Sequence, residues 1–128
     1  MATLTGIATI QGDVTVAAGG QLVPGNSPGI ITVTGDYDQS GDLEIEIIGP
    51  TWPAVAGTDF DQVLVNGPVT LQSSATLTLS YTGSQVLAAA SYIIVSNDGT
   101  DAVVGQFGGL SEGDEFIANG QRFSISYV

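Results

Sequence analysis

Short segments in which apolar and polar residues alternate occur along the whole chain. Two of the clearest are Leu43 to Ile47 and Phe123 to Tyr127. Alternation with a period of two, many β-branched residues and intervening Gly, Asn and Asp are typical of strands that bury one face. Residues 84–90 are the best helix candidate, but they span about two turns at most, so we expect a loop or one short helix there. The sequence therefore predicts an all-β chain.

A sharp corner is predicted at residues 24–29, with the sequence Pro-Gly-Asn-Ser-Pro-Gly. The two prolines fix φ, and the two glycines permit positive φ, so the backbone must turn here. We expect one strand to end before this segment and another to begin after it.

The chain contains an internal repeat. Ile31 to Gly35 matches Val63 to Gly67 at an offset of 32, and Leu43 to Ile47 matches Ala75 to Leu79 at the same offset. Thr9 to Gly12 precedes a matching segment by 23 residues, and residues 49–57 form an extra loop in the second unit. The basic unit is thus about 20 to 25 residues, in the range of solenoid repeats, and roughly five units fit the chain.

These features predict one β-solenoid domain over residues 1–128, with coils over about residues 1–110 and a capping segment over about 111–128. Phe116 to Phe123 has two apolar arms around Asn-Gly, the strongest short hairpin signal, so we expect a hairpin that closes this end. Thr3, Leu4 and Thr5 lie in a plain N-terminal strand, where we expect an exposed edge that contacts another chain. A β-sandwich is the alternative fold, since short strands and turns serve both.

Six motifs in a fixed order resemble the repeat in passenger domains of bacterial autotransporters and related secreted surface proteins. They are Gly19 to Gly35, Leu43 to Ile47, Phe60 to Val63, Val104 to Phe107, Leu110 to Gly113 and Phe123 to Tyr127. The resemblance implies a right-handed parallel β-helix and a place outside the cell. It implies no single activity, because most such passengers are surface, adhesive or structural modules. One departure is Ala88-Ala89-Ala90-Ser91, where the family commonly has a Pro-containing turn.

Composition excludes several classes of partner. Thirteen Asp and Glu oppose a single basic residue, Arg122, giving a formal net charge of −12. Nucleic acids and anionic lipids need clustered Lys or Arg, so neither is an expected partner. The chain has no cysteine and therefore no disulfide or thiolate metal site.

Residues 1–6 lack the basic and apolar regions of a signal peptide. We therefore expect a mature or excised fragment, a substrate of leaderless secretion, or a virion protein that is released by lysis. No apolar run approaches the roughly 20 residues needed to span a bilayer, so membrane insertion is not expected.

Residues 36–44 resemble the first part of a calcium-binding loop, with oxygen-bearing side chains at alternate positions and a glycine at the sixth. If calcium binds, Asp36, Asp38 and Asp42 are its ligands. Ile47 occupies the position of the bidentate glutamate, and the flanking segments are strands. A polar turn without metal is therefore the favoured interpretation.

Catalysis is not expected. Glu44 and Glu46 are predicted to face away from the core on one strand, with Asp59 and Asp61 on a neighbouring coil. A glycosidase would need a carboxylate pair with one raised pKa in a cleft. The simpler interpretation is a solvated acidic face. No His, Cys or Lys is present as a base, nucleophile or Schiff-base former, and we expect no catalytic residues and no enzyme.

Two further surface features bear on binding. Trp52 lies between Pro50 and Pro53, where it could stack on a sugar, anchor a neighbouring subunit or fold back over the coil. Thr-x-Thr pairs occur at Thr3 and Thr5, Thr32 and Thr34, and Thr76 and Thr78. Such pairs could form a ladder of hydroxyl groups, but threonine is also common on the outer face of strands.

Together these observations predict a non-enzymatic structural or adhesive protein at the cell surface or outside the cell that associates with copies of itself. One alternative is a virion surface protein, such as a capsid decoration or fibre subunit. Another is a carbohydrate-binding module that uses Trp52 and the acidic face to bind a glycan.

Overall fold

The computed structural model describes residues 3–25, 28–48, 54–82, 91–97 and 103–127. Within these residues it contains fourteen β-strands and no helix. The first twelve strands are β1 (Thr3–Gly6), β2 (Ala8–Ile10), β3 (Val14–Val16), β4 (Gln21–Pro24), β5 (Ile30–Val33), β6 (Tyr37–Gln39), β7 (Asp42–Ile47), β8 (Gln62–Val65), β9 (Val69–Leu71), β10 (Thr76–Tyr81), β11 (Val95–Asn97) and β12 (Val103–Gly105). They are followed by β13 (Glu115–Ala118) and β14 (Gln121–Ser124).

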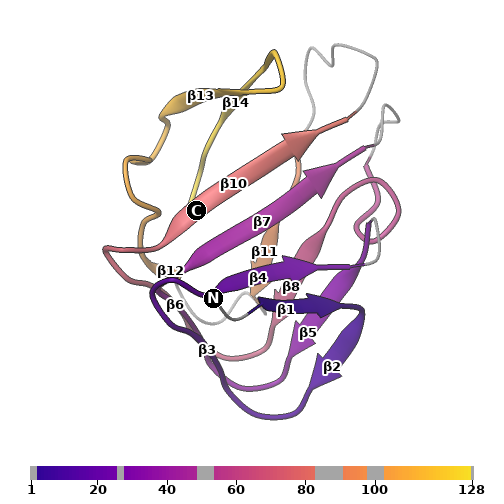
Figure 1. Cartoon of the computed structure of the whole chain (residues 1–128), viewed down its shortest axis with the longest axis vertical. Coiled ribbons are helices and arrows are strands. Elements are labelled where there is room, and N and C mark those ends of the chain that lie inside the picture. The colour runs from indigo at the N-terminus through magenta and orange to yellow at the C-terminus, as the bar shows by residue number, and fades with distance from the viewer. Residues whose placement is uncertain (1–2, 26–27, 49–53, 83–90, 98–102, 128) are drawn as a thin grey trace.

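The first twelve strands form three four-stranded sheets in which every strand pairs in parallel with the third strand along the chain. The orders are β1-β4-β7-β10, β2-β5-β8-β11 and β3-β6-β9-β12. We call these sheets A, B and C, in that order. A set of three successive strands, one in each sheet, is called a rung, so that rung 1 is β1 to β3 and rung 4 is β10 to β12 (Figure 1). This stacking of parallel strands is compatible with the predicted solenoid rather than with a mostly antiparallel sandwich. The expectation of about five coils is not confirmed, since each sheet has four strands in the described part of the chain.

Strand registers test the predicted repeat directly. Thr9 pairs with Thr32, at the predicted offset of 23, and Ile31 pairs with Val63, at the predicted offset of 32. The second predicted pairing at an offset of 32 residues, between Leu43 and Ala75, is wrong, because Leu43 pairs with Leu77. Two residues separate β6 from β7, whereas four separate β9 from β10. The two extra residues are thus in a turn, and a shift of two keeps the same side chains facing inward.

Inward side chains from successive rungs form columns in the core. Leu22, Leu43 and Leu77 share one column of sheet A, and Leu22 and Leu43 are fully buried. Each Leu, Ile or Val that is removed from water in this way contributes about 1.5–3 kcal/mol. The columns therefore supply the main stabilisation of the stack.

The inward face of β6 in sheet C is partly polar. Tyr37 and Gln39 are both fully buried, and the Tyr37 hydroxyl donates to Gln39 Oε1 over 2.5 Å. Burial raises the pKa of Tyr37 above its ordinary value, so the hydroxyl keeps its proton and remains a donor. The Gln39 amide nitrogen is buried without a partner among the described residues.

The predicted corner at residues 24–29 is confirmed. β4 ends at Pro24 and β5 begins at Ile30. Gly25 has a φ of 87°, and a Cβ at this position would lie 2.1 Å from the backbone nitrogen of Gly29. Only glycine tolerates both the backbone conformation and the close approach.

The predicted C-terminal hairpin is also confirmed. β13 and β14 pair antiparallel, and Asn119 and Gly120 between them have φ values of 51° and 82°, as a type I′ turn requires. The hairpin lies beyond β10, at the opposite end of sheet A from β1 (Figure 1). Asn119 Oδ1 accepts a hydrogen bond from the Tyr81 backbone nitrogen over 2.8 Å, which attaches the turn to the end of β10.

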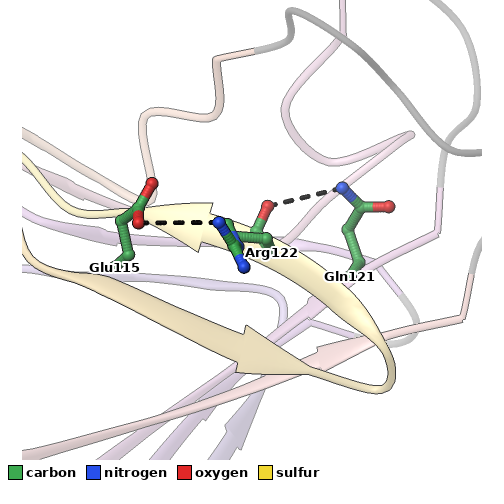
Figure 2. A network of polar contacts seen from close by, with 3 residues as sticks. All are labelled: Glu115, Gln121 and Arg122. Carbon is green, nitrogen blue, oxygen red and sulfur yellow. Dashed lines mark hydrogen bonds and ion pairs between the residues drawn. The ribbon is translucent and has the colours of Figure 1, made fainter.

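Polar contacts on the outside of the hairpin are exposed. An Arg122 nitrogen is 3.8 Å from Glu115 Oε1, and the Gln121 side-chain amide donates to the Arg122 carbonyl over 3.3 Å (Figure 2). Solvent screens such pairs, so they contribute little to stability. Phe123 instead attaches the hairpin to the stack, with its ring centroid 5.8 Å from that of Tyr81.

A cavity of about 730 Å³, lined by both apolar and polar residues, lies between rung 4 and the hairpin. It is lined by inward residues of β10 such as Leu77 and Leu79, and by Phe123 and Tyr127 from the C-terminal segment. Tyr127 is held by two bonds of its hydroxyl, which donates to the Leu110 carbonyl over 2.7 Å and accepts from the Phe107 nitrogen over 3.1 Å. The C-terminal segment therefore covers this end of the core without filling it.

Candidate interaction surface

Rung 1 is one end of the stack in the part of the chain that the structure describes, and no described strand covers it. In the described part of the chain, β1, β2 and β3 each pair with a strand on one side, namely with β4, β5 and β6. The other side of an edge strand presents backbone N–H and C=O groups to any strand that approaches. The prediction that Thr3, Leu4 and Thr5 lie in an edge strand is confirmed, whereas their contact with another chain stays a prediction.

Exposure is concentrated on the first two strands of this rung. Leu4 continues the inward column of Leu22 and Leu43, but 38% of its surface is exposed whereas theirs is fully buried. Ile7, at the corner between β1 and β2, is 66% exposed. In β3, by contrast, Val14 and Val16 are buried. We call residues 3–10, which comprise β1, β2 and their corner, the first-rung surface.

The first-rung surface is uncharged in a strongly acidic protein. Residues 3–12 contain no acidic residue, and the first of the thirteen Asp and Glu in the chain is Asp13. A second copy with the same net charge of −12 meets the least repulsion where no carboxylate is present. Sequence reasoning missed Ile7, although this charge-free stretch would have pointed to it.

The outer face of sheet A carries the predicted threonine and glutamate residues. Thr3 and Thr76 share one outward column and Thr5 and Thr78 another, but they lie on the two edge strands β1 and β10. Two rungs with other side chains, including Asp42, separate them. Thr32 lies in sheet B, so the pairs do not form one continuous ladder.

Asp42 is the centre of a polar network on this face. Its Oδ1 accepts from the hydroxyls of Thr76 and Thr78 over 2.8 and 2.9 Å, and its Oδ2 from the Gln21 amide over 3.3 Å. These bonds join three adjacent strands of sheet A, so the carboxylate connects successive rungs.

Asp61 is a buried carboxylate that sequence reasoning placed on the wrong coil. It lies in the same rung as Glu44 and Glu46, whose side chains face outward as predicted. Asp61 is 3% exposed and accepts two backbone hydrogen bonds of 2.9 Å, from Gly29 to Oδ1 and from Glu46 to Oδ2. The bonds join the corner of rung 2 to the end of β7.

Burial raises the pKa of Asp61 above its ordinary value of 3.8. The two backbone hydrogen bonds oppose this shift, and the charges of Glu46 and Glu44 add to it. These contacts give Asp61 a structural role at the corner. The expectation that the chain is not an enzyme stays a prediction.

The three candidate calcium ligands lie in different elements, namely the turn before β6, β6 itself and β7. Asp36 lies in the turn before β6, where its backbone nitrogen donates to Asp13 Oδ1 over 2.8 Å. Asp38 accepts from the Gln72 amide, and Asp42 accepts from the threonines described above. Across the described ranges, no group of three or more His, Cys, Asp or Glu is arranged to hold a metal ion. Calcium binding by Asp36, Asp38 and Asp42 stays a prediction.

Trp52 lies outside the described residues, as do residues 49–53 and the whole helix candidate at residues 84–90. The role of Trp52 in binding a glycan or a subunit therefore stays a prediction. Among the residues that the structure describes, none belongs to a helix long and apolar enough to cross a membrane.

Comparisons with known proteins give no match: no family model, no curated protein and no solved structure is similar to this chain at a significant level. The resemblance to autotransporter passengers therefore stays an expectation from sequence motifs.

Proposed function

We propose that this protein is a non-enzymatic structural or adhesive element outside the cell that acts by associating with copies of itself. Its domain is a right-handed parallel β-helix in which the hairpin closes one end. The observation that carries the proposal is that all three sheets have an edge strand at rung 1, while the hairpin lies beyond rung 4.

Edge strands favour association for a physical reason. Backbone N–H and C=O groups at a sheet edge gain partners when another strand pairs with them, and soluble proteins usually protect such edges with charges, prolines or a covering segment. β1 and β2 contain neither charged residues nor proline, and Leu4 and Ile7 add exposed apolar surface. This combination is typical of a surface that is covered in the assembled state.

The general rule for crossover connections supports the proposed right-handed form. Each strand of a sheet is joined to its parallel neighbour by a crossover through the other two sheets. Crossovers between parallel strands are almost always right-handed, because of the twist of the strands. The proposed β-helix is consistent with this rule.

The outer surface fits a passive structural role. The outward residues of β10 are Thr76, Thr78 and Ser80, and only 11% of the whole chain is charged. A surface of this kind offers hydrogen-bonding groups for adhesion without the His, Cys or Lys on which most catalytic sites depend.

The test is the mass in solution, measured by light scattering over a concentration series, with electron microscopy of the same samples. Calcium is the one added variable. We expect a defined oligomer whose population grows with protein concentration. A strict monomer at every concentration, with and without calcium, would contradict the proposal and make Trp52 the next residue to test for glycan binding.

A further inference from the structure

We propose that two copies associate head to head through the first-rung surface, around a two-fold axis that passes through the corner at Ile7. In this dimer β1 of each copy lies antiparallel to β2 of the other, and association stops at two copies. The inference rests on the proposed self-association and adds the surface, the symmetry and the stoichiometry.

The hairpin excludes a head-to-tail stack. In such a stack rung 1 of one copy would sit on rung 4 of the next, where β13 and β14 lie. Displacing the hairpin would break the Asn119 bond to Tyr81 and the ring contact of Phe123 with Tyr81. It would also bring Glu115 and its acidic neighbours in the capping segment toward another acidic protein.

The pattern of exposure places the axis. β1 leads into the corner at Ile7 and β2 leads away from it, while β3 has its inward valines buried. A two-fold axis through this corner, perpendicular to the stacking direction, exchanges the positions of β1 and β2. A strand that enters the corner then faces a strand that leaves it, so both new pairs are antiparallel. Antiparallel pairing satisfies edge N–H and C=O groups at least as well as parallel pairing.

Apolar contacts in this arrangement are reciprocal. Ile7 packs on Ile7 of the second copy, and the exposed Leu4 is covered by β2 of the second copy, which extends the apolar column across the interface. A two-fold interface brings each patch against itself, so any charge there would be doubled. Residues 3–12 have none.

Single cysteines test the arrangement, because the natural chain has no cysteine. Ile7→Cys places a thiol at the axis, and Ile117→Cys places one on the hairpin, at a residue that is equally exposed at 68% against 66%. The dimer stacks eight rungs, four from each copy, with seven strand spacings between the first rung and the last. Residues on the two hairpins, which lie beyond these end rungs, are therefore at least about 34 Å apart. A disulfide requires Cβ atoms about 4 Å apart.

We expect mild oxidation to convert Ile7→Cys to a covalent dimer and to leave Ile117→Cys uncrosslinked. Spin labels should likewise show a short distance between copies for Ile7→Cys and a distance beyond about 34 Å for Ile117→Cys. In a head-to-tail stack one displacement relates neighbouring copies, so both labels would report the same distance. That result would overturn the head-to-head arrangement.

Two glutamate substitutions, one at the interface and one at the capped end, complete the test. Ile7→Glu adds two facing carboxylates and removes two apolar contacts, so we expect at least a ~100-fold loss of dimer affinity in a light-scattering titration. Ile117→Glu makes the same chemical change at the capped end and should leave the affinity unchanged. Circular dichroism of both variants establishes that each is folded.

The outcomes separate the two proposals. A wild-type monomer defeats self-association itself, and the head-to-head dimer with it. A wild-type oligomer that survives Ile7→Glu, that crosslinks equally through both cysteines, or that grows into filaments leaves self-association standing and rejects this interface.

Discussion

Asp61 provides a quantitative test of how the corner between rungs is held. Its carboxylate is 3% exposed and accepts from the backbone nitrogens of Gly29 and Glu46, 32 and 15 residues away in the chain. A buried N–H that loses its acceptor costs about 1–3 kcal/mol. Asp61→Ala removes both acceptors and Asp61→Asn removes one, since its amide keeps a single oxygen.

We therefore expect Asp61→Asn to lower the free energy of unfolding by ~1–3 kcal/mol and Asp61→Ala by up to ~6 kcal/mol. Removing a buried charge beside Glu46 and Glu44 offsets part of each loss, because the burial and the repulsion that raise the pKa of Asp61 disappear with it. Urea unfolding followed by circular dichroism measures these differences. Asp38→Asn is the matched control, since Asp38 accepts from the exposed Gln72 side chain, and it should change stability by about 0.5 kcal/mol or less.

The same experiment has a pH dependence of known sign. The pKa of Asp61 is higher in the folded protein than its ordinary value of 3.8, so the folded state binds this proton more tightly than the unfolded state. The stabilisation that comes from this tighter proton binding is fully present below pH 3.8 and is lost as the pH rises through the folded pKa. The gap in stability between wild type and Asp61→Asn should widen as the pH falls toward 3.8. If Asp61→Asn were as stable as wild type at every pH, the two backbone bonds would not hold the corner.

Three further measurements test other parts of the structure. Gly25→Ala should destabilise the protein more than Gly109→Ala in urea unfolding. Both glycines have positive φ, but a Cβ at position 25 would lie 2.1 Å from the Gly29 nitrogen, whereas a Cβ at position 109 would meet nothing within 4 Å. Equal losses of unfolding free energy in the two variants would contradict this close approach. Asn119→Ala should cost about 1–3 kcal/mol, because Ala disfavours a φ of 51° and leaves the Tyr81 N–H without its acceptor, and an unchanged unfolding midpoint would contradict this. Self-association should strengthen as the salt concentration rises from low ionic strength, because salt screens the repulsion between copies that each carry a net charge of −12. Weaker association at 0.15 M than at 0.01 M salt would contradict an uncharged interface.

Local patterns predicted the features that depend on neighbouring residues. Alternation in Leu43 to Ile47 gave the inward and outward faces of β7 correctly, because strand geometry alone decides which side chains share a face. The Asn119-Gly120 pair predicted the hairpin, because few residues tolerate positive φ at both positions.

Features that depend on turns between distant segments were not predictable in the same way. The register of Leu43 with Leu77 depends on two extra residues after β9, which no local pattern distinguishes from strand. The burial of Asp61 is likewise invisible in sequence, since an Asp beside an apolar run usually lies in solvent. Its partners Gly29 and Glu46 come together only when the corner of rung 2 meets the end of β7.

The two extra residues after β9 have a wider consequence for how such a protein evolves. They lengthen one turn while Leu43 and Leu77 still face each other, and the chain between β7 and β8 is longer again while Ile31 and Val63 remain in register. A stack that keeps its core while its corners grow is a tolerant scaffold for inserted loops. New recognition segments can therefore be acquired or grafted at a corner without redesign of the columns inside.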